Sequence, residues 1–120
     1  MTFTLNRYKQ GYVNAENNLG VMYQDANGVA ANEVEALKWF TKAAEQGFPE
    51  AQKNLGAMFE KGIGVPKDYV QAAKWYSLAV AQANEGAVDK YLELAKIMTP
   101  EQVAQAQKMI KDFLAHDSSQ

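Results

Sequence analysis

The sequence predicts an all-α fold: an α-α superhelix, or solenoid, of antiparallel helix pairs that ends in a C-terminal capping helix. Three observations support this prediction. Residues 15–50 are repeated by residues 51–86, an offset of 36 residues. Apolar residues within each repeat follow helical spacing, and the breaks between them carry glycine, proline or helix-capping residues.

The repeat extends through both halves of the unit. The matching residues of the first copy are Ala15, Leu19, Gly20, Tyr23, Asn32, Ala36, Lys38, Trp39 and Ala43. Their counterparts are Ala51, Leu55, Gly56, Phe59, Asp68, Ala72, Lys74, Trp75 and Ala79. The chain is therefore divided into a partial N-terminal repeat at 1–14, repeats at 15–50 and 51–86, a degenerate third unit with a capping helix at 87–115, and a flexible tail at 116–120.

Each full unit is predicted to contain two helices. In the first helix of the second unit, Ala51, Leu55, Met58 and Phe59 form one apolar stripe at i, i+4, i+7 and i+8. Glycines at 62 and 64 then indicate a turn.

The second helix begins at Asp68, an N-cap residue with Gln71 three positions later, and Asn32 and Glu35 have the same roles in the first unit. The apolar stripe of this second helix is Ala36, Trp39, Phe40 and Ala43 in the first unit and Ala72, Trp75, Tyr76 and Ala79 in the second.

The ends of the second helices differ between the units. Gly47 with Pro49 ends the first. Ala83 stands in that place in the second unit, so we expect Asn84 or Gly86 to adopt the left-handed conformation. Thr99-Pro100, with Gln102 at N3, predicts the start of the capping helix.

The pattern A-x-x-x-L-G-x-x-Y, followed by G-x-G-V-x-x-D-x-x-x-A-x-x-W-x-x-x-A-x-x-x-G, resembles the Sel-1-like repeat (SLR) family. That family is a helical relative of the tetratricopeptide repeat. The second unit carries almost the whole pattern, and the first departs at Ala26 and Asn32, which still suit a turn and a cap. The resemblance extends from about residue 7 to 115 and implies a bacterial protein-binding scaffold.

Two departures from the family pattern bear on the interpretation. The cysteine pair of some bacterial members is absent, because the chain has no cysteine. The start is also irregular: Phe3 occupies the Trp position, but Arg7 and Tyr8 replace the paired alanines. An uncovered N-terminal end would expose apolar surface around Ala15, Leu19 and Tyr23. Two interpretations are open: the chain forms a homodimer through this end, or it is a fragment of a longer array.

Composition argues against several function classes. The net charge of −2, with no basic block, argues against nucleic-acid binding. No stretch is long and apolar enough for membrane insertion. The absence of a signal peptide favours a cytoplasmic location, and a periplasmic or secreted location stays open if a signal was removed.

The sequence does not predict an enzyme, a cofactor or a metal site. His116 is the single histidine and lies near the C-terminus. Ser77 stands in S-L-A-V rather than S-x-x-K, and the glycines of 62-GIGV-65 lack the following G-K-[ST] of a phosphate loop. Trp39 and Trp75 are predicted to pack between helices rather than bind a ligand.

The predicted function is non-catalytic protein–protein interaction, in which a peptide or protein binds to the concave face formed by the first helices. The candidate binding residues are Asn17, Val21, Gln24, Lys53, Ala57, Glu60, Asp89, Glu93 and Lys96. The pair Asn18 and Asn54 is expected either to bridge neighbouring turns or to bind a peptide backbone. Two alternatives remain: a cell-envelope binder or weak hydrolase of β-lactams or peptidoglycan fragments, and a structural segment of a longer array.

Overall fold

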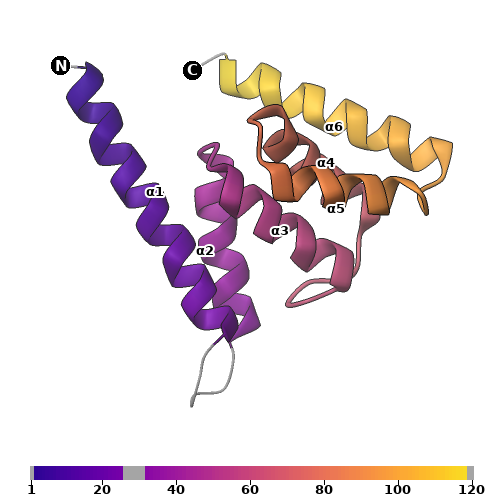
Figure 1. Cartoon of the computed structure of the whole chain (residues 1–120), viewed down its shortest axis with the longest axis horizontal. Helices are drawn as coiled ribbons and strands as arrows, with labels where there is room; N and C mark the ends of the chain where they lie inside the picture. Colours follow the sequence, from indigo (N-terminus) through magenta and orange to yellow (C-terminus); the bar gives the residue numbers. More distant parts are fainter. Residues whose placement is uncertain (1, 26–31, 119–120) are drawn as a thin grey trace.

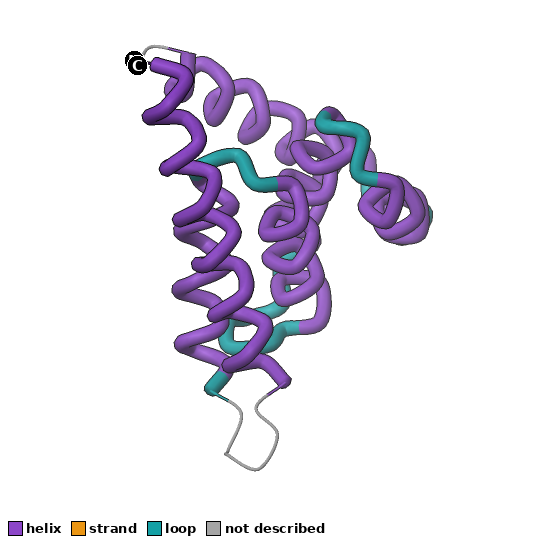
Figure 2. Tube along the Cα trace, turned by 60° about the vertical axis from the view of Figure 1, so that its left-hand side comes forward, coloured by secondary structure: helices purple, strands orange, loops and turns teal. Residues whose placement is uncertain are grey.

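The structure, a computed structural model, describes the backbone of residues 2–25 and 32–118 and the side chains of residues 11–24 and 32–115. These residues form helices and loops without a strand, which confirms the all-α prediction (Figures 1 and 2). The helices are α1 (Thr2–Asp25), α2 (Glu33–Glu45), α3 (Pro49–Lys61), α4 (Tyr69–Ala81), α5 (Glu85–Ala95) and α6 (Pro100–Ser118). None of the described helices has the length and apolar character needed to cross a membrane.

The helices form a slab that is two helices thick. Its extents are 42 × 41 × 22 Å, and the short dimension equals about two helix diameters of 10–12 Å each. α1 packs on α2 and α3 packs on α4, while α2 also packs on α3, so consecutive pairs stack as a solenoid (Figure 1). α1 lies along one edge of this stack.

The second helices begin as predicted. The side chains of Asn32 and Asp68 accept the N3 backbone N–H groups of Glu35 at 3.0 Å and of Gln71 at 3.1 Å. The N–H of Asp68 also donates to the Phe59 carbonyl at 2.9 Å, and the N–H of Asn32 makes the equivalent bond to residue 23 at 3.1 Å. The turn residues 26–31, which include Ala26, lie outside the described residues.

The turn after α4 differs from the prediction. Ala83 itself adopts the left-handed conformation, with φ of 63°, as Gly47 does with φ of 91°. Asn84 is instead the N-cap of α5 and accepts the Ala87 N–H at 3.0 Å. The reason is that both turns form the same backbone hydrogen bonds to the preceding helix, and these bonds place the residue at 47 or 83 in the left-handed region.

Small residues at fixed positions allow the two helices of a unit to approach closely. A Cβ atom added at Gly20 would lie 2.6 Å from the Phe40 ring, and one added at Gly56 would lie 2.7 Å from the Tyr76 ring. Phe40 and Tyr76 are both fully buried. These glycine–aromatic contacts are the same in both repeats, so they define how each pair packs.

The two ends of the chain depart from the predicted boundaries. α1 continues straight through Gly11, so residues 2–14 and the first helix of the repeat 15–50 form a single helix. At the other end α6 continues to Ser118, so residues 116–118 of the expected flexible tail are helical. The start of α6 agrees with the prediction: the Thr99 N–H donates to Gln102 at 2.9 Å, and the Gln102 N–H donates to Thr99 at 3.1 Å.

Candidate functional site: an open groove beside α5

The third unit lacks the glycine that allows the two helices of each preceding unit to pack closely. Leu92 stands 36 residues after Gly56, which itself stands 36 residues after Gly20. A leucine side chain there occupies the space that an adjacent second helix needs. α6 packs mainly on α4, and it meets α5 only where Leu94 and Ala106 join one buried cluster. Phe113 of α6 meets Trp75 of α4 edge to face, with ring centroids 5.5 Å apart.

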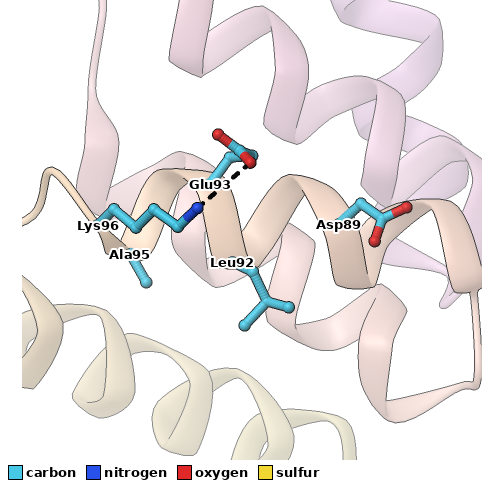
Figure 3. Close-up of a pocket in the computed structure, with 5 residues that line it drawn as sticks. All are labelled: Asp89, Leu92, Glu93, Ala95 and Lys96. Atoms are coloured by element: carbon cyan, nitrogen blue, oxygen red, sulfur yellow. Dashed lines mark ion pairs between the residues drawn. The ribbon is translucent and has the colours of Figure 1, made fainter.

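An open groove lies on the face of α5 that α6 leaves uncovered. It has a volume of about 540 Å³ and is lined by Asp89, Leu92, Glu93, Ala95 and Lys96 (Figure 3). Leu92 is 54% exposed and extends from α5 on the side of α6. Lys96 and Glu93 form an ion pair of 3.6 Å beside it. The groove therefore combines an apolar centre with charges of both signs.

Three of the predicted binding residues, Asp89, Glu93 and Lys96, line this groove. The sequence prediction missed Leu92 and Ala95. The signal that could have identified them was the leucine in the place of two aligned glycines, because a leucine there leaves no room for the aromatic ring that the glycines receive in the first two units.

The first predicted set on α1 does not project into solvent as expected. Asn17 is only 7% exposed, and its Oδ1 accepts a hydrogen bond from Asn54 Nδ2 at 3.2 Å. Asn54 thus bridges neighbouring units, but its partner is Asn17 and not Asn18, which is exposed. Val21 and Gln24 are both half-buried, and Val21 packs against the core.

The second set, on α3, also faces neighbouring helices. Lys53 is half-buried and pairs with Glu50 at 3.3 Å, Ala57 packs against the core, and Glu60 accepts the Tyr76 hydroxyl at 2.7 Å. The physical reason is that α3 is buried on two sides, against α2 and against α4. The apolar stripe of the sequence indicates only the side of α3 that faces α2. The residues that were assigned to a free face lie on the side that faces α4.

Electrostatic contacts reinforce the junction between α3 and α5. Asn84 Nδ2 donates to Glu50 at 2.8 Å. This hydrogen bond, together with the nearby Lys53 ammonium, lowers the pKa of Glu50 against the opposing effect of its burial. The N-cap of α5 is therefore hydrogen-bonded to α3, while α5 itself packs on α4.

The residues considered for catalysis or ligand stacking lie away from this groove. Ser77 is half-buried in α4, and the side chain of His116 lies outside the described residues. Trp75 is 4% exposed, which confirms its packing role, whereas Trp39 is half-buried with Lys42 Nζ 4.9 Å from its ring centroid. No cluster of three or more His, Cys, Asp or Glu suited to a metal ion occurs among the described residues.

These features define a helical-repeat solenoid with an exposed groove at its C-terminal end. The chain belongs to the Sel1 repeat family, because the family model matches residues 13–48 and 49–84, which together make up more than half of it. The matched repeats begin two residues before the boundaries assigned from the sequence. Proteins with Sel1 repeats are generally protein-interaction scaffolds.

Two solved structures show the same fold. The first is a protective antigen present in uropathogenic Escherichia coli strains, which displays an SLR fold; identity is 32% and the TM-score is 0.81, over 90% of this chain and 23% of that one. The second is a Sel1 repeat protein from Oxalobacter formigenes, with 44% identity and a TM-score of 0.64, over 68% of this chain and 61% of that one. A search of curated proteins found no match. The chain thus spans about a quarter of the antigen and less than two thirds of the Oxalobacter protein.

Proposed function

We propose that this chain is a non-catalytic interaction module that binds a helical segment of another protein in the groove beside α5. The observation that carries the proposal is the exposed Leu92 in the position of Gly20 and Gly56, with α6 displaced onto α4. α5 consequently presents a surface that, in the preceding unit, binds a helix.

The chemistry of the groove indicates what the partner helix needs. On α3, the equivalent surface receives the large Tyr76 ring over Gly56. On α5, Leu92 already occupies that space, so the partner needs small residues opposite Leu92 and apolar residues beside Ala95. Asp89, Glu93 and Lys96 lie exposed around them and favour a partner with flanking charges of both signs.

The test selects helical peptides from a displayed random library against the intact chain and measures their affinity by fluorescence polarisation. The selected peptides are then measured against Leu92→Glu and against the matched control Val34→Glu. Val34 is 68% exposed on α2, away from the groove, so both variants add one carboxylate to an exposed apolar site. Circular dichroism verifies that both variants keep their helices.

The proposal is supported if the selected peptides bind Leu92→Glu at least tenfold more weakly than the wild type and bind Val34→Glu with unchanged affinity. Failure to select any peptide, or equal affinity for the two variants, overturns it. A reversal of charge at Lys96 provides a second measurement: Lys96→Glu should weaken acidic peptides and leave the helicity of the chain unchanged, because this side chain is exposed.

A further inference from the structure

We infer that two copies of this chain associate by antiparallel pairing of their α1 helices. The pairing surface is an apolar stripe on the outer side of α1, formed by Tyr12, Ala15, Leu19, Met22 and Tyr23. Tyr12 is 72% exposed, Met22 is 67% exposed and Tyr23 is 37% exposed. α1 lies at the opposite end of the stack from α5, the helix that bears the groove (Figure 1).

The equivalent stripe in the next unit is a helix-docking surface. The residues at the same repeat positions on α3 are Phe48, Ala51, Leu55, Met58 and Phe59. Among them Ala51 and Met58 have no exposed surface and Leu55 is 1% exposed, because α2 packs on α3. The α1 stripe keeps the alanine, leucine and methionine and has tyrosines in place of the two phenylalanines, but none of the described helices covers it.

The described residues that precede this stripe do not fold back over it. Before α3, Gly47 reverses the chain with a φ of 91°, so that α2 folds back over the stripe of α3. At the equivalent Gly11 the helix continues without a turn, and residues 2–10 extend away from the stripe in line with it.

A polar residue beside the stripe argues against a preceding repeat in the usual geometry. Gln52 is buried and bridges both neighbours: its Oε1 accepts from Gln82 at 2.9 Å, and its Nε2 donates to the Ala44 carbonyl of α2 at 3.2 Å. The equivalent residue on α1 is Glu16, which accepts from Gln46 at 2.7 Å. A carboxylate cannot donate to a backbone carbonyl. If a preceding helix packed on α1 in the way that α2 packs on α3, the backbone carbonyl at the position of Ala44 would face the Glu16 carboxylate without a hydrogen bond.

The spacing of the stripe suits a pair of long helices. Tyr12, Ala15, Leu19 and Met22 are separated by three, four and three residues, the spacing of a coiled-coil seam. In the sequence the same register continues back to Tyr8 and Leu5. A helix of 24 residues is about 36 Å long, so α1 provides three heptads for the pairing.

A second copy offers its own α1 stripe to this surface, and the pair then covers both exposed stripes at once. The second helices α2 and α4 are covered by the first helices that follow them, α3 and α5, so they cannot dock on another copy. Association is therefore isologous, with the same face used on both copies.

Charge favours the antiparallel arrangement. In the sequence, α1 has Arg7 and Lys9 near its start and Asp25 at its end, so antiparallel helices bring ends of opposite charge together. Glu16 does not contribute, because it accepts from Gln46 and pairs with Lys42 of its own chain at 3.9 Å. The seam also matches in size, because Tyr12 of one helix then lies opposite Ala15 of the other.

The first experiment measures the mass of the intact chain by sedimentation equilibrium over micromolar to millimolar concentrations. We expect a reversible dimer, since one helix pair is a small interface. Met22→Glu should give a monomer, and Val34→Glu, an equally exposed site on α2, should stay dimeric. A wild-type monomer throughout this range, or a dimer that Met22→Glu does not weaken, overturns the inference.

Engineered cysteines test the orientation, because the chain has none of its own. In the antiparallel pair Ala15→Cys alone should not form a disulfide-linked dimer under mild oxidation, whereas Tyr12→Cys combined with Ala15→Cys should. Rapid crosslinking of the single variant, or no crosslinking of either, contradicts antiparallel pairing through this seam. Neither result depends on the α5 groove.

Discussion

Replacement of Gly56 by alanine should destabilise the chain, although alanine is the better helix-forming residue. Gly56 lies within α3, against the second helix of its own unit. A Cβ atom there would lie 2.7 Å and 2.8 Å from two ring carbons of Tyr76 and 3.2 Å from the backbone oxygen of Ala72. Tyr76 has little freedom to move away, because it is fully buried and its hydroxyl donates to Glu60 at 2.7 Å.

The magnitude follows from two opposing effects. Introducing a methyl group into a packed interior costs about 1–3 kcal/mol. Removing the conformational freedom of a helical glycine returns up to about 1 kcal/mol. The contacts below 3.0 Å with a buried ring place the cost in the upper part of the first range, about 2–3 kcal/mol, so we expect Gly56→Ala to lower the free energy of unfolding by about 1–2 kcal/mol.

The assay is urea-induced unfolding followed by circular dichroism, with Gly11→Ala as the matched control. Gly11 is also helical, but a Cβ atom there would meet nothing within 4 Å. Gly11→Ala should therefore stabilise the chain by about 0.5–1 kcal/mol. If Gly56→Ala were as stable as the wild type, close approach of α3 and α4 could not be the reason for glycine at this position. A destabilising Gly11→Ala would show that residue 11 forms a turn, as Gly47 does, instead of continuing α1.

Three further predictions concern the interior and the turns. Trp75→Ala should lower the free energy of unfolding by about 3–5 kcal/mol, because Trp75 is 4% exposed and packs on Phe113; a urea melt showing less than about 1 kcal/mol would contradict its burial. Ala83→Gly should raise the melting temperature, with a gain of about 1 kcal/mol from relief of the left-handed alanine at φ of 63°, and an unchanged or lower value would argue against that conformation. Burial and the hydrogen bond to Glu60 raise the pKa of Tyr76, so the folded chain should lose stability above pH 10 by up to about 1.4 kcal/mol per pH unit as the unfolded tyrosine ionises. Tyr76→Phe should cost about 1 kcal/mol at pH 7 and remove this alkaline loss, so parallel pH profiles of the two proteins would refute the assignment.

Local signals in the sequence were sufficient for the helix starts. The caps at Asn32, Asp68 and Thr99 form as predicted, since their hydrogen bonds reach only three residues along the chain. Ala83 could not be assigned in this way. Its left-handed conformation follows from hydrogen bonds that the whole turn forms with the end of α4, and these prevail over the local preference for glycine or asparagine.

The binding face was harder to predict because a first helix inside the stack is buried on two sides. The large apolar residues of α3 face α2, and they were correctly assigned to the core. The side that faces α4 carries small or polar residues, such as Gly56 and Glu60, whose burial no apolar periodicity indicates. Asn17 was placed in solvent for the same reason, whereas the residues of α5 project freely because α6 leaves that side open.

The surfaces proposed for binding coincide with departures from the repeat, and this coincidence has a physical basis. A residue that keeps the repeat pattern is committed to a contact with the next helix, as Gln52 is to both of its neighbours. Where the pattern changes, one of those contacts is lost: Leu92 fills the space that receives the Tyr76 ring over Gly56 in the preceding unit, and Glu16 cannot donate to a preceding helix. Each change leaves an apolar helix face without its usual partner at one end of the stack. We therefore use the positions that break the repeat to identify the proposed binding surfaces of this short solenoid. These positions are a more direct guide than the charged residues that the sequence placed on a concave face.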